Sequence, residues 1–152
     1  MKEIKIGMKS EAETIVTKEN FAVTVGSGSL EVFATPMMTA LMEKAAAATV
    51  SECMENDETT VGTMLNITHS SATPEGMKVK AYAEVTEVNG REITFRVWAE
   101  DEAGLIGEGT HKRFVVFAEK FMKKTSSWLS YGKLRFSWGE NGNRDIGIYA
   151  AL

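Results

Sequence analysis

The fold is decided by residues 35–54, which read TPMMTALMEKAAAATVSECM. Thr is a favoured N-cap and Pro is tolerated at the first helical position, so Thr35-Pro36 predicts a helix start with Thr35 as the N-cap. From Met37 to about Met54 the apolar residues recur at helical spacing. We expect one helix of roughly 27 Å, at about 1.5 Å per residue. Its apolar stripe is Met38, Leu41, Met42, Ala45 and Thr49.

The opposite side of this helix carries small residues where a solvated face would carry Lys and Glu. These residues are Ala40, Glu43, Ala47 and Ser51. We therefore expect the helix to be packed on both sides and Glu43 to be at least partly buried. A partly buried carboxylate can act as a base or a nucleophile. The plainer alternative is a Glu43-Lys44 pair at the surface, where most Glu residues lie.

The sequence after residue 58 changes from helical to strand periodicity. Asn89-Gly90 predicts a type I′ hairpin turn, and Asp101–Gly104 predicts a second turn. Residues 2–6 and 12–17 are weaker strand candidates. A strand, one long helix and four strands joined by short turns predict an α+β fold, in which the helix lies against one antiparallel sheet. The expected strand faces are Val61, Thr63, Leu65, Ile67 and His69; Val79, Ala81, Ala83 and Val85; Ile93, Phe95, Val97 and Ala99; and a last strand from about Leu105 to Phe117.

Length and composition suit one intracellular globular domain. The 152 residues fit a single domain, and a net charge of −4 gives no basic surface that would attract nucleic acid. The single cysteine, Cys53, excludes an internal disulfide and fits a reducing compartment. We expect no signal peptide at the N-terminus and no membrane partner, since no stretch approaches about 20 apolar residues. These features predict a cytoplasmic protein.

The C-terminal residues 125–152 differ from the rest. Apolar residues alternate on either side of a turn-rich segment, Gly139–Asn143. This pattern predicts an extra β-hairpin appended to a domain of residues 1–124, with a poorly packed extension as the alternative.

Three further residues are candidates for chemistry. His69 shares the predicted core-facing side of its strand with Ile67, so it could polarise a carbonyl or shuttle a proton, or be a structural histidine. The Thr35 hydroxyl, at a helix start, could hold a carbonyl oxygen as well as cap the helix. Arg113 could contact a phosphate or fix a carboxylate, or lie on a solvated face. Neither a G-x-S-x-G elbow nor a His/Cys metal cluster is present, and no metal is expected.

Three blocks of sequence carry a resemblance when taken together. They are Val32-Phe33-Ala34-Thr35-Pro36 with Leu41-Met42-Glu43; Val61-Gly62-Thr63 with Thr68-His69 and Ala72-Thr73-Pro74; and Gly107-Glu108-Gly109-Thr110-His111-Lys112-Arg113. In order and spacing these blocks resemble the fluoroacetyl-CoA thioesterase-like branch of the hotdog superfamily, and the match covers nearly everything up to about Lys124.

The resemblance implies a hotdog fold, a site at the interface of a homodimer, and hydrolysis of acyl-CoA with no cofactor beyond the CoA of the substrate. It implies catalytic roles for Thr35, Glu43 and His69 and supporting roles for Gly62 and Arg113. Whether Glu43 attacks directly or activates water is left open, as is the pairing of dimers into tetramers. Alternatives on the same fold are a non-catalytic acyl-CoA-binding protein and an enoyl-CoA hydratase or dehydratase.

One departure from that family concerns the loop before the helix. The fluoroacetate-selective enzyme carries aromatic gate residues there, whereas this loop reads Gly26-Ser27-Gly28-Ser29. We therefore expect a general short-acyl thioesterase without selectivity for fluoroacetyl-CoA.

Overall fold

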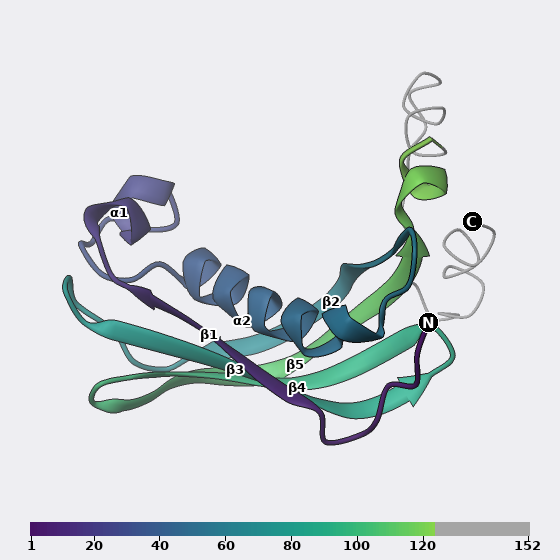
Figure 1. Ribbon diagram of the computed structural model, residues 1–152. Coiled ribbons are helices and arrows are strands. Elements are labelled where there is room, and N and C mark those ends of the chain that lie inside the picture. Colours follow the sequence, from purple (N-terminus) through teal and green to yellow (C-terminus); the bar gives the residue numbers. More distant parts are fainter. Residues whose placement is uncertain (124–152) are drawn as a thin grey trace.

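One long helix lies in the hollow of a curved five-stranded antiparallel sheet in the computed structural model, which describes residues 1–123 (Figure 1). The strand order is β1-β3-β4-β5-β2, so β2 and β1 form the two edges. This is the α+β architecture predicted from the sequence. The predicted hairpin in residues 125–152 lies outside the described residues. The elements are β1 (Lys9–Ile15), η1 (Lys18–Asn20), α1 (Ala22–Val25), α2 (Thr35–Val50), η2 (Ser51–Cys53), β2 (Glu58–His69), β3 (Lys78–Asn89), β4 (Glu92–Asp101) and β5 (Gly104–Phe117).

The start of α2 differs from the prediction in a way that concerns the site. Ala34 is the N-cap and forms no side-chain capping bond, while Thr35 is already helical and Pro36 follows it. The prediction that Thr35 caps the helix was therefore wrong. Its hydroxyl bonds instead to His69 on another element. The helical pattern also ends earlier than Met54, because the chain tightens into the 3₁₀ turn η2 after Val50.

The apolar stripe of α2 is buried as predicted, but its second side is not covered by any part of residues 1–123. All five predicted stripe residues are buried. On the other side Ala40 and Ser51 are exposed, and Glu43 and Ala47 are only half-buried. The expectation of packing on both sides is therefore not met within one chain. Another polypeptide could approach the α2 backbone closely on this side, because an alanine side chain has only one carbon atom.

The central strands follow the predicted alternation. Every predicted core residue of β3 and β4 is at most 1% exposed, from Val79 to Val85 and from Ile93 to Ala99. The alternation fails in β2, where a β-bulge between Gly62 and Met64 shifts the register against β5. Leu65 pairs with the buried His111 and so shares the inward face with Ile67 and His69, although it is 41% exposed at the edge of the sheet. Val61, on the other side of the bulge, packs instead against Phe114 and Val116 in a separate cluster. Bulges of this kind re-aim side chains near functional sites.

Two smaller predictions need correction. Residues 2–6 form no strand: Ile4 is buried in the core, but the backbone turns at Gly7 (φ +94°) before it can join the ladder. The β3–β4 hairpin is present, but Asn89 pairs with Glu92, so the loop residues are Gly90 and Arg91. Only Gly90 has a positive φ (64°), whereas a type I′ turn requires a positive φ at both loop residues.

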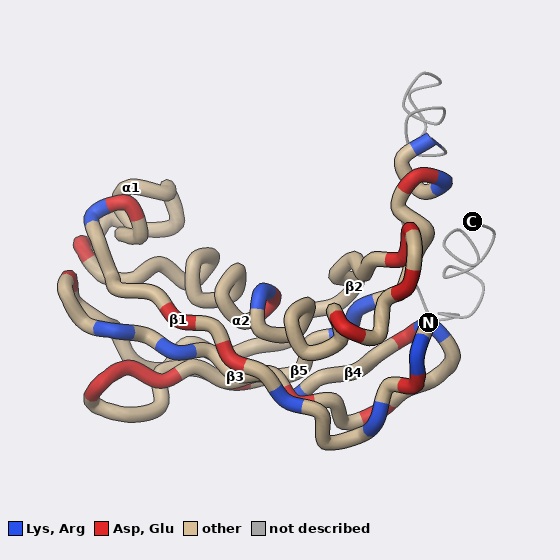
Figure 2. The backbone as a smooth tube through the Cα atoms, in the orientation of Figure 1, with Lys and Arg blue, Asp and Glu red and all other residues tan. Residues whose placement is uncertain are grey.

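Charged residues are distributed unevenly over the elements (Figure 2). Strands β1, β3, β4 and β5 each carry several charged residues, β2 carries only Glu58, and α2 carries charge only at Glu43 and Lys44. No helix in residues 1–123 is long and apolar enough to cross a membrane. Glu43 is therefore the only acid of α2, and Lys44 is the only other charged residue of this helix.

Candidate active site

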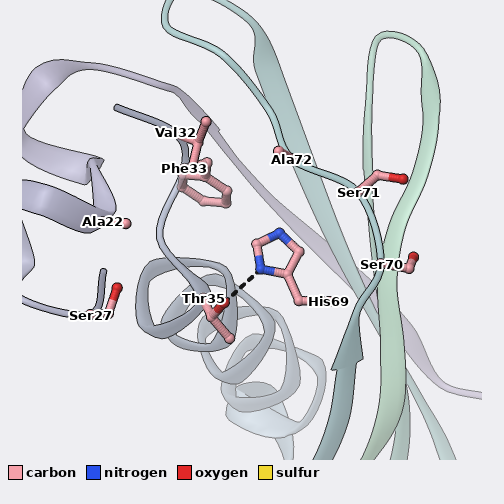
Figure 3. A pocket seen from close by; sticks show the side chains of 9 residues that line it. All are labelled: Ala22, Ser27, Val32, Phe33, Thr35, His69, Ser70, Ser71 and Ala72. Atoms are coloured by element: carbon pink, nitrogen blue, oxygen red, sulfur yellow. Dashed lines mark hydrogen bonds between the residues drawn. The ribbon is translucent and has the colours of Figure 1, made fainter. Parts of the chain in front are cut away.

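A hydrogen bond joins the first residue of α2 to the last residue of β2 (Figure 3). The hydroxyl Oγ1 of Thr35 lies 2.7 Å from Nδ1 of His69. Because Ala34 rather than Thr35 occupies the capping position, this hydroxyl is available to fix the orientation of the imidazole. The sequence analysis selected both residues, and the fold brings them together.

The second ring nitrogen of His69 points away from Thr35, toward the space between Phe33 and Ala72 (Figure 3). This Nε2 is buried and has no hydrogen-bond partner among residues 1–123. A cavity of about 250 Å³ lies beside it, lined by Ala22, Ser27, Val32, Phe33, Thr35, His69, Ser70, Ser71 and Ala72. Burial lowers the pKa of His69 below its usual value, against a smaller opposing effect of the Ser71 backbone. A neutral imidazole therefore presents an unpaired nitrogen beside a cavity.

Glu43 belongs to a second polar group, formed by the middle of α2 with β2 and β5. Its Oε2 lies 3.6 Å from Nη1 of Arg113, whose side chain is 10% exposed. The guanidinium is held in place by Thr60 of β2: Nε donates to Oγ1 at 2.8 Å and Nη2 donates to the backbone carbonyl at 3.0 Å. Of the alternatives for Arg113, the structure gives the one in which the guanidinium faces a carboxylate.

Gly62 provides the space in which the Glu43 carboxylate lies. A Cβ at position 62 would lie 2.8 Å from Oε2 of Glu43, 3.2 Å from Cε1 of His111 and 3.5 Å from Nη1 of Arg113. The first of these distances is shorter than a carbon–oxygen contact permits. The absence of a side chain at position 62 therefore allows the carboxylate to approach the β2 backbone.

His111 of β5 is the remaining member of this second polar group. It is fully buried, and its Nδ1 lies 2.8 Å from the carbonyl oxygen of Met64. Its Nε2 lies 3.2 Å from Nη1 of Arg113. Burial lowers the pKa of His111, and the Arg113 charge lowers it further, against opposing effects of the Met64 carbonyl and of Glu43.

The two groups are separate within one chain. Thr35 and Glu43 are eight positions apart on α2, which corresponds to roughly 12 Å along the helix axis. The Thr35 hydroxyl bonds to His69, so within residues 1–123 it orients the imidazole and not the carboxylate of Glu43. Glu43 lies on α2 and His69 on β2, but the two side chains are not in contact within residues 1–123.

Two residues of the second group, Thr60 and His111, were not selected from the sequence. Thr60 carries no distinctive signal, since its role depends on the pairing of β2 with β5. His111 had one: it shares a strand face with Arg113, two residues away, and a buried histidine between apolar strands needs polar partners. Among residues 1–123 no group of three or more His, Cys, Asp and Glu side chains could hold a metal ion.

The two histidines predict that the protein is less stable at mildly acidic pH. Burial lowers the pKa of each imidazole in the folded state below its ordinary value of 6.5, so the unfolded chain takes up protons first as the pH falls. The free energy of unfolding should therefore decrease below about pH 6.5, by at most about 1.4 kcal/mol per pH unit for His111. Urea unfolding at pH 7.0, 6.5, 6.0 and 5.5 measures this slope. An unchanged free energy across that range would contradict the assignment of buried neutral imidazoles.

Comparisons with known proteins give one consistent result. Residues 16–119 match the model of the family described as fluoroacetyl-CoA-specific thioesterase. The fluoroacetyl-CoA thioesterase of Streptantibioticus cattleyicolor is 44% identical over 94 residues, which are 62% of this chain and 68% of that protein. A solved structure of the fluoroacetyl-CoA thioesterase FlK superposes with a TM-score of 0.78 at 33% identity, covering 82% of this chain and 97% of that one.

A second solved structure extends the likeness beyond FlK. A hypothetical protein of Thermus thermophilus, a thioesterase superfamily member, superposes with a TM-score of 0.76 at 27% identity, covering 86% of this chain and 99% of that one. The family model spans more than half of the present chain, including every residue of both polar groups. The chain therefore belongs to the fluoroacetyl-CoA-specific thioesterase family of hotdog-fold proteins.

Proposed function

We propose that this protein is an acyl-CoA thioesterase that hydrolyses short-chain acyl-CoA esters to the free acid and CoA. The observation that carries the proposal is the Thr35–His69 pair, which leaves a buried, unpartnered Nε2 beside a cavity of about 250 Å³. A buried polar atom without a partner requires explanation, and a substrate oxygen or sulfur atom would supply the missing partner. The thioesterase activity named for the relatives agrees with this use.

In this mechanism His69 acts on the thioester. If the Thr35 hydroxyl donates to Nδ1, then Nε2 carries the proton of the neutral ring and donates to the substrate. That donor either polarises the thioester carbonyl or transfers its proton to the departing thiolate of CoA. Thr35 fixes the tautomer and the plane of the ring, which is the role of an orienting group beside a catalytic histidine.

Glu43 supplies the nucleophile or the base. As a nucleophile, its carboxylate attacks the thioester carbon, the C–S bond breaks, and water then hydrolyses the acyl-enzyme anhydride. As a base, it removes a proton from a water molecule that attacks the same carbon. Arg113, whose Nη1 lies 3.6 Å from the carboxylate, helps to fix its position, and Gly62 keeps the space around it open.

The acyl group is proposed to be short and need not carry fluorine. The loop before α2 contains Gly26, Ser27, Gly28 and Ser29, and so brings no aromatic ring to the cavity. Phe33 does line the cavity, but it is only 1% exposed and belongs to the core. These residues give no feature that would favour a fluorinated acyl group over an acetyl group.

The functional unit is proposed to be a homodimer, in which Glu43 of one chain approaches the Thr35–His69 pair of the other. Two observations support it. The two polar groups are roughly 12 Å apart along α2 in one chain. The second side of α2 is lined with small residues that nothing within residues 1–123 covers, beside the twelve-residue edge strand β2. An uncovered edge strand of that length is a template for pairing with another chain.

Association of two dimers into a tetramer would use another surface.

We expect the purified protein to sediment as a dimer, with a mass close to twice the 16.7 kDa of one chain. Equilibrium sedimentation at micromolar concentration measures this directly. A protein that sediments as a monomer and still hydrolyses acyl-CoA at full rate would contradict the shared site while leaving the activity in place.

The proposed reaction uses only side chains and water, with CoA entering as part of the substrate. We propose no metal ion, no nucleic acid and no membrane as a partner. The free, buried thiol of Cys53 suits the reducing environment of the cytoplasm, which is the proposed location.

A panel of acyl-CoA esters tests this function. We expect thiol release from acetyl-, propionyl- and butyryl-CoA, with fluoroacetyl-CoA favoured over acetyl-CoA by less than roughly tenfold, the lower end of the range over which apolar pockets discriminate small changes. Binding of all esters without thiol release would indicate a non-catalytic acyl-CoA-binding protein. Hydration of crotonyl-CoA without thiol release would indicate a hydratase, although α2 has no histidine to pair with Glu43.

A further inference from the structure

His111 lies at the centre of the buried contacts that surround the Arg113 guanidinium. It has no exposed surface, and both of its ring nitrogens have partners: the Met64 carbonyl at 2.8 Å and Nη1 of Arg113 at 3.2 Å. We propose that His111 is a positioning residue for the hydrolase site, which fixes Arg113 and through it the carboxylate of Glu43. This inference rests on the proposed function, because it assigns no chemistry to His111 apart from that of Glu43.

The contacts leave only one protonation state for the ring. A carbonyl oxygen only accepts, so the hydrogen of the neutral imidazole lies on Nδ1 and is donated to Met64. Nε2 is then a lone pair, and it accepts a hydrogen bond from Nη1 of Arg113. The β-bulge between Gly62 and Met64 lies beside this contact. The bulge and the histidine together connect the β2 backbone to the guanidinium.

The guanidinium is thereby held from three directions. Thr60 accepts from Nε and from Nη2, and His111 accepts from Nη1. Glu43 faces the same Nη1 at 3.6 Å. The carboxylate therefore meets a cation that cannot rotate away. Loss of the His111 acceptor would free one side of the guanidinium, and a displacement of about 1 Å near a reacting group can cost roughly 100-fold in rate.

Packing alone does not account for a histidine at this position. Its neighbour Phe95 stacks against the ring at 6.1 Å between centroids, and Val115 and Ile106 of the same strand are apolar. An apolar side chain would fill the same space without the cost of burying two polar nitrogens. An apolar side chain would not form the hydrogen bonds that the two ring nitrogens make to the Met64 carbonyl and to Nη1 of Arg113.

The ring must be neutral to fill this role. Protonation would place an N–H on Nε2 against the Arg113 guanidinium and remove the acceptor. The charged groups facing His111 are Arg113 of β5 and Glu43 of α2. Burial and Arg113 both lower the pKa of His111, in the direction that keeps the acceptor available at neutral pH.

A matched pair of variants tests the proposal, because Gln and Met have nearly the same length but only Gln carries a strong acceptor. We expect His111→Met to lower kcat by roughly 10- to 100-fold with KM changed less than about threefold. His111→Gln should recover most of this loss. The control Phe95→Leu disturbs the same part of the core without touching the guanidinium, and should lower stability while leaving kcat near wild type.

The outcomes separate this inference from the proposed function. If the wild type hydrolyses acyl-CoA and Glu43→Gln does not, a His111→Met enzyme with wild-type kcat overturns the positioning role alone. If the wild type shows no hydrolysis, the proposed function fails first. If His111→Met does not fold, nitrogen NMR of the wild-type protein tests the positioning role instead, by reporting the charge and the tautomer of the His111 ring. A neutral ring with its proton on Nδ1 at the pH of maximal activity is expected, and a charged ring or a proton on Nε2 would overturn the proposal.

Discussion

Replacing Glu43 by Gln is expected to reduce kcat for acyl-CoA hydrolysis by roughly 10²- to 10⁴-fold, which is the rate enhancement that a general base typically contributes. The amide has the same shape as the carboxylate and keeps the fold, but it neither attacks a thioester nor accepts a proton from water. The Arg113 guanidinium retains both bonds to Thr60 and its bond to His111, so it is not left without partners. Thiol release under saturating substrate measures the loss.

The neighbouring Lys44 offers a matched control for this variant. Lys44→Gln also removes one charge from α2, but at an exposed position outside both polar groups, and should leave kcat unchanged. Turnover of Glu43→Gln above about a tenth of the wild-type rate would be too fast for an enzyme that has lost its base, and would remove Glu43 from the mechanism.

The same residue allows the two mechanisms to be distinguished. In a single turnover in ¹⁸O-labelled water, a general base directs the label into the product acid only. A nucleophilic carboxylate forms an anhydride, and attack of water on its Glu43 carbonyl leaves the label in the protein. Mass spectrometry of the peptide that contains Glu43 therefore separates general-base catalysis from that nucleophilic route.

The sequence predicted the elements of this fold well where one local pattern dominated. The α2 stripe and the alternation of β3 and β4 are strong periodic signals that tertiary packing reinforces, and their burial matches the prediction. The predictions failed where a long-range contact decided the local structure. Thr35 has the propensity of an N-cap, yet its hydroxyl bonds to a histidine 34 residues away and leaves the cap to Ala34.

For the site, most of the functional side chains could be predicted from the sequence, but not which of them lie together in the fold. The bulge after Gly62 is set by the pairing of β2 with β5, so a strict period of two could not reveal it. The pairing of Glu43 with Arg113 joins residues 70 positions apart, and His111 entered the same group without having been selected. Residue types can suggest chemistry, whereas distances between strands decide which residues share it.

Gly62→Ala is the second variant for which we expect a large effect, because the new methyl group would enter the space of the Glu43 carboxylate. The Cβ would lie 2.8 Å from Oε2, so the carboxylate must move by several tenths of an ångström, or the β2 backbone must. His111 at 3.2 Å limits any movement of the methyl group in the other direction. We expect kcat to fall roughly 10-fold, because a displacement of about 1 Å at a reacting group can cost roughly 100-fold and this one is smaller.

A double-mutant cycle shows whether this loss arises from contact with Glu43. Glu43→Ala removes the carboxylate and opens the space that the methyl group of Gly62→Ala would fill. If the steric argument holds, Gly62→Ala should destabilise the wild type but have a much smaller effect in the Glu43→Ala background. Val61→Ala is the control, since Val61 packs against the Phe114–Val116 cluster, and its effect on the free energy of unfolding should be the same in both backgrounds. Equal destabilisation by Gly62→Ala in both backgrounds would mean that the backbone at the bulge, and not the carboxylate, requires glycine.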